Sequence, residues 1–232
     1  MIGGDSVGAI LVAAGRSTRM GFDKLWADLG GRPVLAWSLA ALARCAALDR
    51  LVVVTSEDRQ DDAWRLVGRT VPARLHGRAV IGGERRRDSV AAGLDALNDC
   101  TWVLVHDAAR PFLSEAVIAR GLDEVLTAGA CVAALPARDT IKRVRSDRTV
   151  VETPAREELW TVQTPQIFRR DLVQVALAAT DEDATDEAGL VERIGGTVRV
   201  FEGDVLGFKI TTPDDLEIAR ALLTLRSKTS AP

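Results

Sequence analysis

The stretch VGAILVAAGRSTRMGFDK, residues 7–24, joins a short apolar run to a loop of small and basic residues. Residues 7–13 are small or branched apolar residues, which is typical of a strand buried within a parallel sheet. Ligands of open α/β sheets bind beyond the carboxyl ends of the strands. The loop at residues 13–24 therefore lies where a ligand is expected.

Strand-like and helix-like patterns alternate outward from this first strand. Further buried strands are predicted at 50–56, 78–83, 101–107 and 130–136, and helices between them at 33–46, 58–67, 85–97 and 114–128. Later in the chain we expect helices at 169–179, 185–194 and 213–226 and strands at 197–203 and 207–211. This alternation predicts an α/β fold with helices on both faces of a mostly parallel sheet.

One segment, residues 137–158, interrupts the alternation. Polar and apolar residues interleave along it, which predicts a β-hairpin with its turn at 146–148. The hairpin has too few large apolar residues to hold a core of its own. It either extends the sheet of the same chain or packs as an arm on a second copy, and we favour the arm. The rest of residues 1–232 is expected to form a single domain.

Composition excludes several function classes. The chain has 232 residues, 47% of them hydrophobic, and a formal net charge of −3 without long charged blocks. No nucleic-acid tail, basic membrane-binding surface or membrane-spanning stretch is therefore expected. The amino terminus has no signal-peptide core. Three widely spaced cysteines are typical of packing residues in a reducing compartment, so we expect a cytoplasmic protein.

The first loop has the features of an anion site. Small residues Ala13, Ala14 and Gly15 let backbone N–H groups approach an anion, and Arg19 and Lys24 add positive charge. Only four of the 30 basic residues are lysine, so the lysines that remain stand out. The spacing matches neither GxGxxG nor GxxxxGK[ST]. Taken alone, this segment fits a structural loop with solvated arginines equally well.

Other blocks of the sequence support a nucleotide site. The first loop, AAGRSTRMGFDK, resembles the signature loop of nucleotidyltransferases. GGERRRDSVAAGL, VHDAARP, RDTIKR, TPQIF, TDEAGLVE and FKITTPDDLEIA follow in the order typical of the 2-C-methyl-D-erythritol 4-phosphate cytidylyltransferase family. The resemblance covers about residues 7–225. It implies a Rossmann-like three-layer nucleotidyltransferase fold and transfer of CMP from CTP to 2-C-methyl-D-erythritol 4-phosphate, with release of pyrophosphate, in isoprenoid precursor biosynthesis.

The resemblance also implies site residues. Catalytic roles fall to four basic residues, Arg19, Lys24, Arg156 and Lys209. Substrate contacts are implied for Ala13, Ala14, Gly15, Gly83, Glu84, Ser89, Asp107, Ala108, Arg110, Thr140, Thr164 and Thr185. Mg²⁺ or another divalent cation would be held mostly by the CTP phosphates, with Asp107 as its candidate protein ligand. The family places Thr140 and Arg156 in the neighbour's site across a homodimer. His106 is expected as a positioned neighbour rather than a base.

The sequence differs from the family pattern at three positions, one before Lys24 and two before Lys209. Asp23 stands where proline commonly precedes the loop lysine, and Gly207 with Phe208 replaces asparagine and isoleucine before Lys209. A related transferase using ribitol 5-phosphate or another nucleoside triphosphate is the main alternative. A dinucleotide-dependent oxidoreductase is disfavoured because GxGxxG is absent and the second strand lacks a terminal acidic residue. Retention of Arg19, Lys24, Asp107 and Lys209 together disfavours an inactive binding protein.

Overall fold

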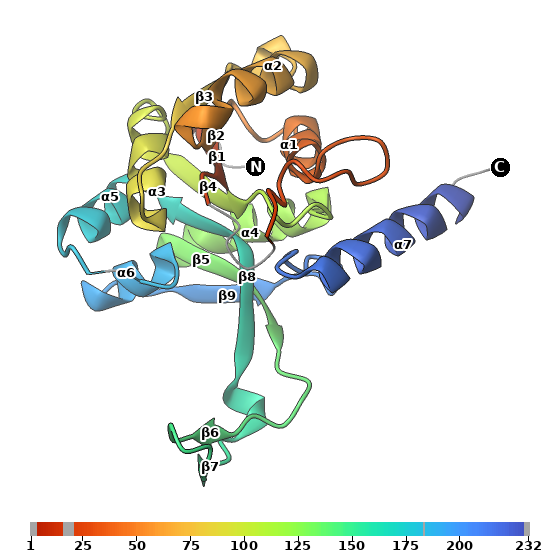
Figure 1. Cartoon of the computed structure of the whole chain (residues 1–232). Helices are drawn as coiled ribbons and strands as arrows, with labels where there is room; N and C mark the ends of the chain where they lie inside the picture. The colour runs from red at the N-terminus through yellow and green to blue at the C-terminus, as the bar shows by residue number, and fades with distance from the viewer. Residues whose placement is uncertain (1–3, 16–20, 183, 230–232) are drawn as a thin grey trace.

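The computed structural model describes residues 4–15, 21–182 and 184–229. A seven-stranded sheet runs through the molecule in the order β3-β2-β1-β4-β8-β5-β9 (Figure 1). Its strands are β1 (Val7–Ala13), β2 (Arg50–Thr55), β3 (Gly77–Ile81), β4 (Trp102–Asp107), β5 (Ala130–Pro136), β8 (Trp160–Arg169) and β9 (Arg199–Glu202). All neighbouring strands pair in parallel except β8, which is antiparallel to both β4 and β5. The predicted α/β class with a mostly parallel sheet is confirmed.

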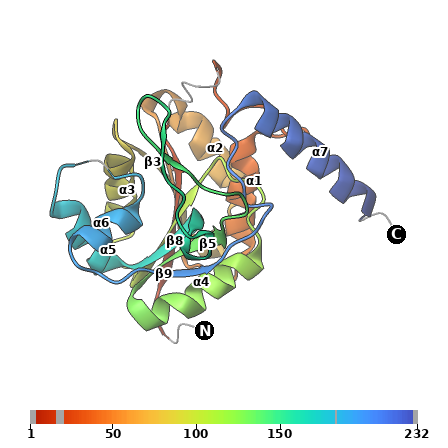
Figure 2. The same cartoon turned by 90° about the horizontal axis from the view of Figure 1, so that it is seen from below.

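Helices cover both faces of the sheet (Figure 2). They are α1 (Val34–Arg44), α2 (Gln60–Thr70), α3 (Arg86–Asp95), α4 (Glu115–Ala128), α5 (Arg170–Ala178), α6 (Glu187–Arg193) and α7 (Pro213–Thr229). Helices α1, α2 and α4 pack on one face, in a core that includes Leu11, Leu39 and Ile118. Helices α3, α5 and α6 pack on the other face, around residues such as Ile10, Leu94 and Val173. Alternate residues of β1 thus pack in the cores on opposite faces of the sheet, because successive side chains of a strand point to opposite faces.

Local sequence signals fix several helix ends. Ser114 caps α4, its hydroxyl oxygen accepting from the Val117 backbone N–H at 3.4 Å. Gly129 ends the same helix with φ of +77°, a left-handed conformation that favours glycine. Pro213, Asp214 and Asp215 open α7. Ser114 thus starts α4 after β4, and Gly129 turns the chain from α4 into β5.

The arm predicted at residues 137–158 projects from the body between the carboxyl end of β5 and the amino end of β8 (Figure 1). Its hairpin is confirmed but short, consisting of β6 (Arg143–Val144) and β7 (Val150–Glu152). Every residue of the two strands is exposed. Apolar side chains on the arm and the adjoining strand, Ile141, Val144, Val150, Val151, Trp160 and Val162, are also exposed.

One predicted strand is absent, and one observed strand was not predicted. Residues 207–211 form no strand; the segment is irregular, and Ile210 packs with Phe112 and Leu216 in a small core beneath α7. Conversely, β8 was not predicted, although it lies inside the sheet between β4 and β5. The predicted starts and ends of the other elements differ from the observed ones by a few residues.

Candidate active site

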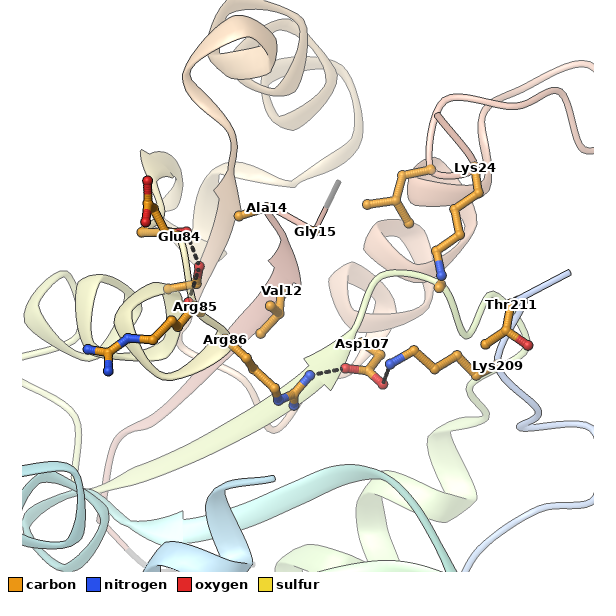
Figure 3. Close-up of a pocket in the computed structure, with 14 residues that line it drawn as sticks. Val12, Ala14, Gly15, Lys24, Glu84, Arg85, Arg86, Asp107, Lys209 and Thr211 are labelled. Atoms are coloured by element: carbon orange, nitrogen blue, oxygen red, sulfur yellow. Dashed lines mark hydrogen bonds and ion pairs between the residues drawn. The ribbon is translucent and has the colours of Figure 1, made fainter. Parts of the chain in front are cut away.

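A pocket of about 260 Å³ opens where β1 and β4 end (Figure 3). Four chain segments build its wall: the end of β1 with the first loop, the turn before α3, the end of β4, and residues 209–211. The lining residues are Val12, Ala14, Gly15, Lys24, Leu25, Gly83, Glu84, Arg85, Arg86, Ser89, Asp107, Ala109, Lys209 and Thr211. The pocket lies at the edge of the sheet where the sequence predicted a ligand.

Asp107 ends β4 as a buried carboxylate among three basic side chains. Lys209 Nζ lies 2.9 Å from Asp107 Oδ2, and Arg110 Nε lies 3.5 Å from the same oxygen. Arg86 Nη1 donates to Asp107 Oδ1. Burial alone would raise the pKa of Asp107, but Arg86, Lys209 and Arg110 hold that pKa far below its usual range. Asp107 is therefore ionised at physiological pH.

Arg86 joins Asp107 to a second buried carboxylate. Its Nε and Nη2 donate to the two oxygens of Glu187 at 3.0 and 2.9 Å, a two-pronged contact that fixes the guanidinium plane. Burial would lower the pKa of Arg86, but Asp107 and Glu187 raise it, so the guanidinium stays charged. Sequence reasoning missed both residues. Arg86 lies within three consecutive arginines, and Glu187 was noted only as part of the TDEA block.

Lys24 and Lys209 enter the pocket on the same side (Figure 3). Lys24 Nζ donates to the Ile210 carbonyl at 2.9 Å. The Ile210 N–H in turn donates to the Ala109 carbonyl at 2.9 Å. These bonds tie the first loop, the segment that carries Lys209 and the end of β4 together. Lys24 and Lys209 thus line one pocket together with Asp107.

The turn before α3 forms the opposite wall. A Cβ atom at Gly82 would lie 2.6 Å from Ser89 Oγ and 2.8 Å from Ala14 Cβ, so only glycine permits this close approach to the first loop. Gly83 and Glu84 are exposed at the pocket, and Ser89 is buried behind them. The Ser89 hydroxyl lies 3.3 Å from the Gly83 carbonyl. Three of the implied substrate contacts, Gly83, Glu84 and Ser89, thus share one wall.

The remaining predicted residues of the first loop and of β4 have different surroundings. Ala14 and Gly15 line the pocket, whereas Ala13 is buried at the end of β1. Ala108 is fully buried, and its neighbour Ala109 faces the pocket instead. Arg110 Nη1 donates to the Gly207 carbonyl at 2.8 Å, which anchors the segment before Lys209. Arg19 lies outside the described residues.

The residues predicted to bind the acceptor phosphate are dispersed in this chain. Thr140 and Arg156 are exposed on the arm, outside the wall of the pocket, and Arg156 Nη1 donates to the Arg138 carbonyl at 3.1 Å. Thr185 is exposed just before α6. Thr164 is buried beside β4. The structure therefore does not bring these four side chains together within one chain.

Thr164 belongs to a hydrogen-bond chain behind Asp107. His106 Nε2 lies 3.1 Å from the Arg110 carbonyl, which can only accept, so Nε2 carries the proton and Nδ1 is the acceptor. The Thr164 hydroxyl then donates to His106 Nδ1 at 2.9 Å. Its oxygen accepts from the Asp107 backbone N–H at 3.1 Å. The neutral imidazole thereby fixes the backbone from which the Asp107 side chain extends.

Stability should fall in acid because of His106. Burial lowers the pKa of this imidazole from 6.5 to about 4. As the pH falls from 6.5 towards 4, the unfolded chain binds a proton at this position that the folded chain does not, so unfolding becomes easier. We expect the melting temperature to drop between pH 7 and pH 5, and to drop less in His106→Gln. Burial raises the pKa of Glu187, which makes the folded protein more stable as the pH falls. Wild type and His106→Gln share this opposite effect, so it does not change the comparison between them. Equal slopes would contradict this role for His106.

The described residues do not build a metal site of their own. They contain no group of three or more His, Cys, Asp or Glu side chains placed to hold a metal ion. Both oxygens of Asp107 already contact basic side chains. Mg²⁺ commonly takes one or two carboxylates together with substrate phosphates. Any metal ion here would therefore depend on the phosphates of a ligand.

Within the described part of the chain, no helix combines the length and apolar content needed to cross a bilayer.

Comparison with known proteins identifies the family of this chain. The sequence model of the family described as 2-C-methyl-D-erythritol 4-phosphate cytidylyltransferase matches residues 7–225. An enzyme of that name from Dehalococcoides mccartyi is 44% identical over 220 residues, covering 94% of this chain and 96% of the relative. One from Rhodococcus jostii is 43% identical, covering 93% and 94%. The crystal structure of 4-diphosphocytidyl-2C-methyl-D-erythritol synthase from Anaerococcus prevotii superposes with a TM-score of 0.84 at 30% identity, covering 95% and 99% of the two chains. The chain belongs to the 2-C-methyl-D-erythritol 4-phosphate cytidylyltransferase family.

Proposed function

We propose that this protein transfers the cytidylyl group of CTP to the phosphate of 2-C-methyl-D-erythritol 4-phosphate, giving 4-diphosphocytidyl-2-C-methyl-D-erythritol and pyrophosphate. Membership of the family supports the substrates. The observation in the structure that carries the proposal is the pocket at the carboxyl edge of the sheet, which both Lys24 and Lys209 line and in which Lys209 pairs with Asp107. The product would serve isoprenoid precursor biosynthesis.

The reaction joins two anions. An oxygen of the acceptor phosphate attacks the α-phosphorus of CTP, and the bond from that phosphorus to the bridging oxygen of the β-phosphate breaks. Negative charge builds on the phosphoryl oxygens, so catalysis consists mainly of positioning and charge stabilisation. Lys24 supplies a compact cation whose position the Ile210 carbonyl sets. The already ionised acceptor phosphate needs no general base.

Asp107 and Arg86 form the fixed part of this site. Lys209 neutralises one oxygen of Asp107, and Arg86 contacts the other. A phosphate in the pocket competes with Asp107 for the Lys209 ammonium. Arg86 and Arg110 continue to hold the carboxylate when Lys209 turns to that phosphate, because Glu187 and Gly207 anchor them independently. Asp107 thus remains in place to contact the ribose.

The divalent cation is proposed to arrive with the nucleotide. We infer that Mg²⁺ binds as the Mg²⁺–CTP complex, because Asp107 is occupied by basic side chains. Asp107 is proposed to contact the metal ion only when Lys209 has moved away from the Asp107 carboxylate.

A homodimer is proposed from the arm. Residues 137–158 expose apolar side chains such as Val144 and Val150 on a hairpin without a core of its own. Thr140 and Arg156 lie on this arm, outside the pocket of their own chain. We infer that the arm packs on a second copy and completes that copy's acceptor site.

The three cysteines are buried and form no disulfides, which fits a reducing compartment, and we propose that the protein is located in the cytoplasm.

Pyrophosphate release tests the reaction. With CTP, 2-C-methyl-D-erythritol 4-phosphate and Mg²⁺, we expect steady release that stops when a chelator removes the metal and resumes when Mg²⁺ is restored. Ribitol 5-phosphate in place of the acceptor, and GTP, ATP or UTP in place of CTP, should give far lower kcat/KM. A higher kcat/KM with any of these would assign the alternative substrate. Release that persists in excess chelator would contradict the metal requirement.

A further inference from the structure

An acidic side chain lies directly beside the lysine that must bind a polyanion. Asp23 precedes Lys24, and only Lys24 of the two lines the pocket. A carboxylate in this position repels a triphosphate and competes with it for the Lys24 ammonium. The site therefore requires something that neutralises Asp23 and keeps it away from the phosphates.

Arg59 meets that requirement. Arg59 ends the short 3₁₀ turn Glu57–Arg59 that precedes α2, and its Nε lies 3.1 Å from Asp23 Oδ2. A second contact joins Arg59 Nη1 to Asp62 Oδ2 at 3.2 Å. The Arg59 guanidinium carbon also lies 5.3 Å from the centre of the Trp26 ring. Asp62 and Trp26 thus fix the side chain that holds Asp23.

Asp23 also orders the backbone that follows Lys24. Asp23 Oδ1 accepts from the Leu25 N–H at 3.2 Å, and the Asp23 carbonyl accepts from the Trp26 N–H at 3.2 Å. Leu25 is buried, and its carbonyl accepts from the Leu35 N–H at 2.9 Å. Lys24 therefore extends into the pocket from a turn anchored by an ion pair on one side and by core packing on the other.

We propose that Arg59 is a positioning residue for nucleotide binding, which neutralises Asp23 and holds its carboxylate away from the triphosphate contacted by Lys24. This inference rests on the proposed function, because it requires a polyanionic nucleotide in the pocket. About a third of each of the two side chains is exposed, so the pair contributes little to stability. Its effect should appear in binding rather than in folding.

Removal of Arg59 tests the proposal. In Arg59→Ala we expect the KM for CTP, and the Kd for Mg²⁺–CTP measured by calorimetry, to rise about tenfold, with a smaller change in kcat. The excess over wild type should shrink as salt is added, because screening weakens the repulsion from Asp23. Arg65→Ala is the matched control. Arg65 also pairs with Asp62, at 2.9 Å, and comes from the same helix region, but it is not paired with Asp23.

Removal of the Asp23 charge should suppress the defect. In the double variant Arg59→Ala/Asp23→Asn, we expect the Kd for Mg²⁺–CTP to return to that of Asp23→Asn alone, and Arg59→Lys should retain most of the affinity. The proposal is overturned if the changes in Kd of Arg59→Ala and Asp23→Asn multiply in the double variant, or if Arg65→Ala loses as much affinity for Mg²⁺–CTP as Arg59→Ala. It is also overturned if the melting temperature of Arg59→Ala falls enough to explain the loss of affinity. Wild-type protein that binds Mg²⁺–CTP without turnover would instead count against the proposed reaction, and the binding comparison would still decide the role of Arg59.

Discussion

Replacement of Lys24 by alanine should lower kcat about 100-fold or more, by analogy with the loss of a single oxyanion-stabilising donor. The Lys24 ammonium is held at the pocket by the Ile210 carbonyl, and the proposed reaction requires a cation there to stabilise the charge that develops on the transferred phosphoryl group. Single-turnover and steady-state rates with CTP and 2-C-methyl-D-erythritol 4-phosphate would measure the effect. A turnover within about threefold of wild type would remove Lys24 from the mechanism.

The conservative variant Lys24→Arg refines this test. It keeps the charge but replaces a compact ammonium with a planar fork, so we expect partial activity between those of alanine and wild type. Circular dichroism and melting curves should match wild type for both variants, because the Lys24 side chain is only partly buried. A loss of secondary structure would assign the defect to folding instead.

The second large effect concerns the arm. Arg156→Ala and Lys24→Ala are each expected to be nearly inactive as homodimers. If Arg156 completes the neighbour's site, a mixed dimer of the two variants has one site with both lesions and one with neither. Random reassembly of equal amounts should then recover about a quarter of the wild-type activity, because half of the dimers are mixed and each has one intact site.

Differently tagged subunits provide the control for this mixing experiment. Tandem purification through both tags isolates the mixed dimers, and their specific activity should approach half of the wild-type value. Mixed dimers that form but remain inactive would count against a shared site and would place Arg156 in its own chain's chemistry or outside the site. A protein that remains monomeric at assay concentration would contradict the proposed arm exchange.

The sequence was sufficient for the strands that contain an uninterrupted run of apolar residues. β1, β2, β4 and β5 are such strands, and each was predicted within one or two residues. β8 was missed because WTVQTPQIFR mixes polar residues with a proline, and its partners β4 and β5 lie far away in the sequence. The opposite error arose at 207–211, where apolar Phe208 and Ile210 serve the small core beneath α7 rather than a sheet. Local patterns do not reveal which partner an apolar residue will find.

For the candidate site, the sequence was informative wherever a residue type was rare. Lysine is scarce in this chain, and Lys24 and Lys209 were both singled out and both line the pocket. Arg86 was not singled out because arginine is abundant, and its partner Glu187 lies 101 positions away. Burial of that pair depends on α3 and α6 meeting at the end of β4. Such a meeting of distant elements becomes visible only in three dimensions.

Because β8 lies between β4 and β5, the sheet cannot be completed during synthesis until β8 has been made. Strands β1 to β4 find their mutual partners within the first 107 residues, but β5 bonds only to β8 and β9. A nascent chain that ends before residue 160 therefore has β5 without a neighbour and one edge of β4 open to other chains. Ribosome-bound fragments of that length should bind chaperones or aggregate, and release from this state should coincide with the emergence of residues 160–169 from the exit tunnel.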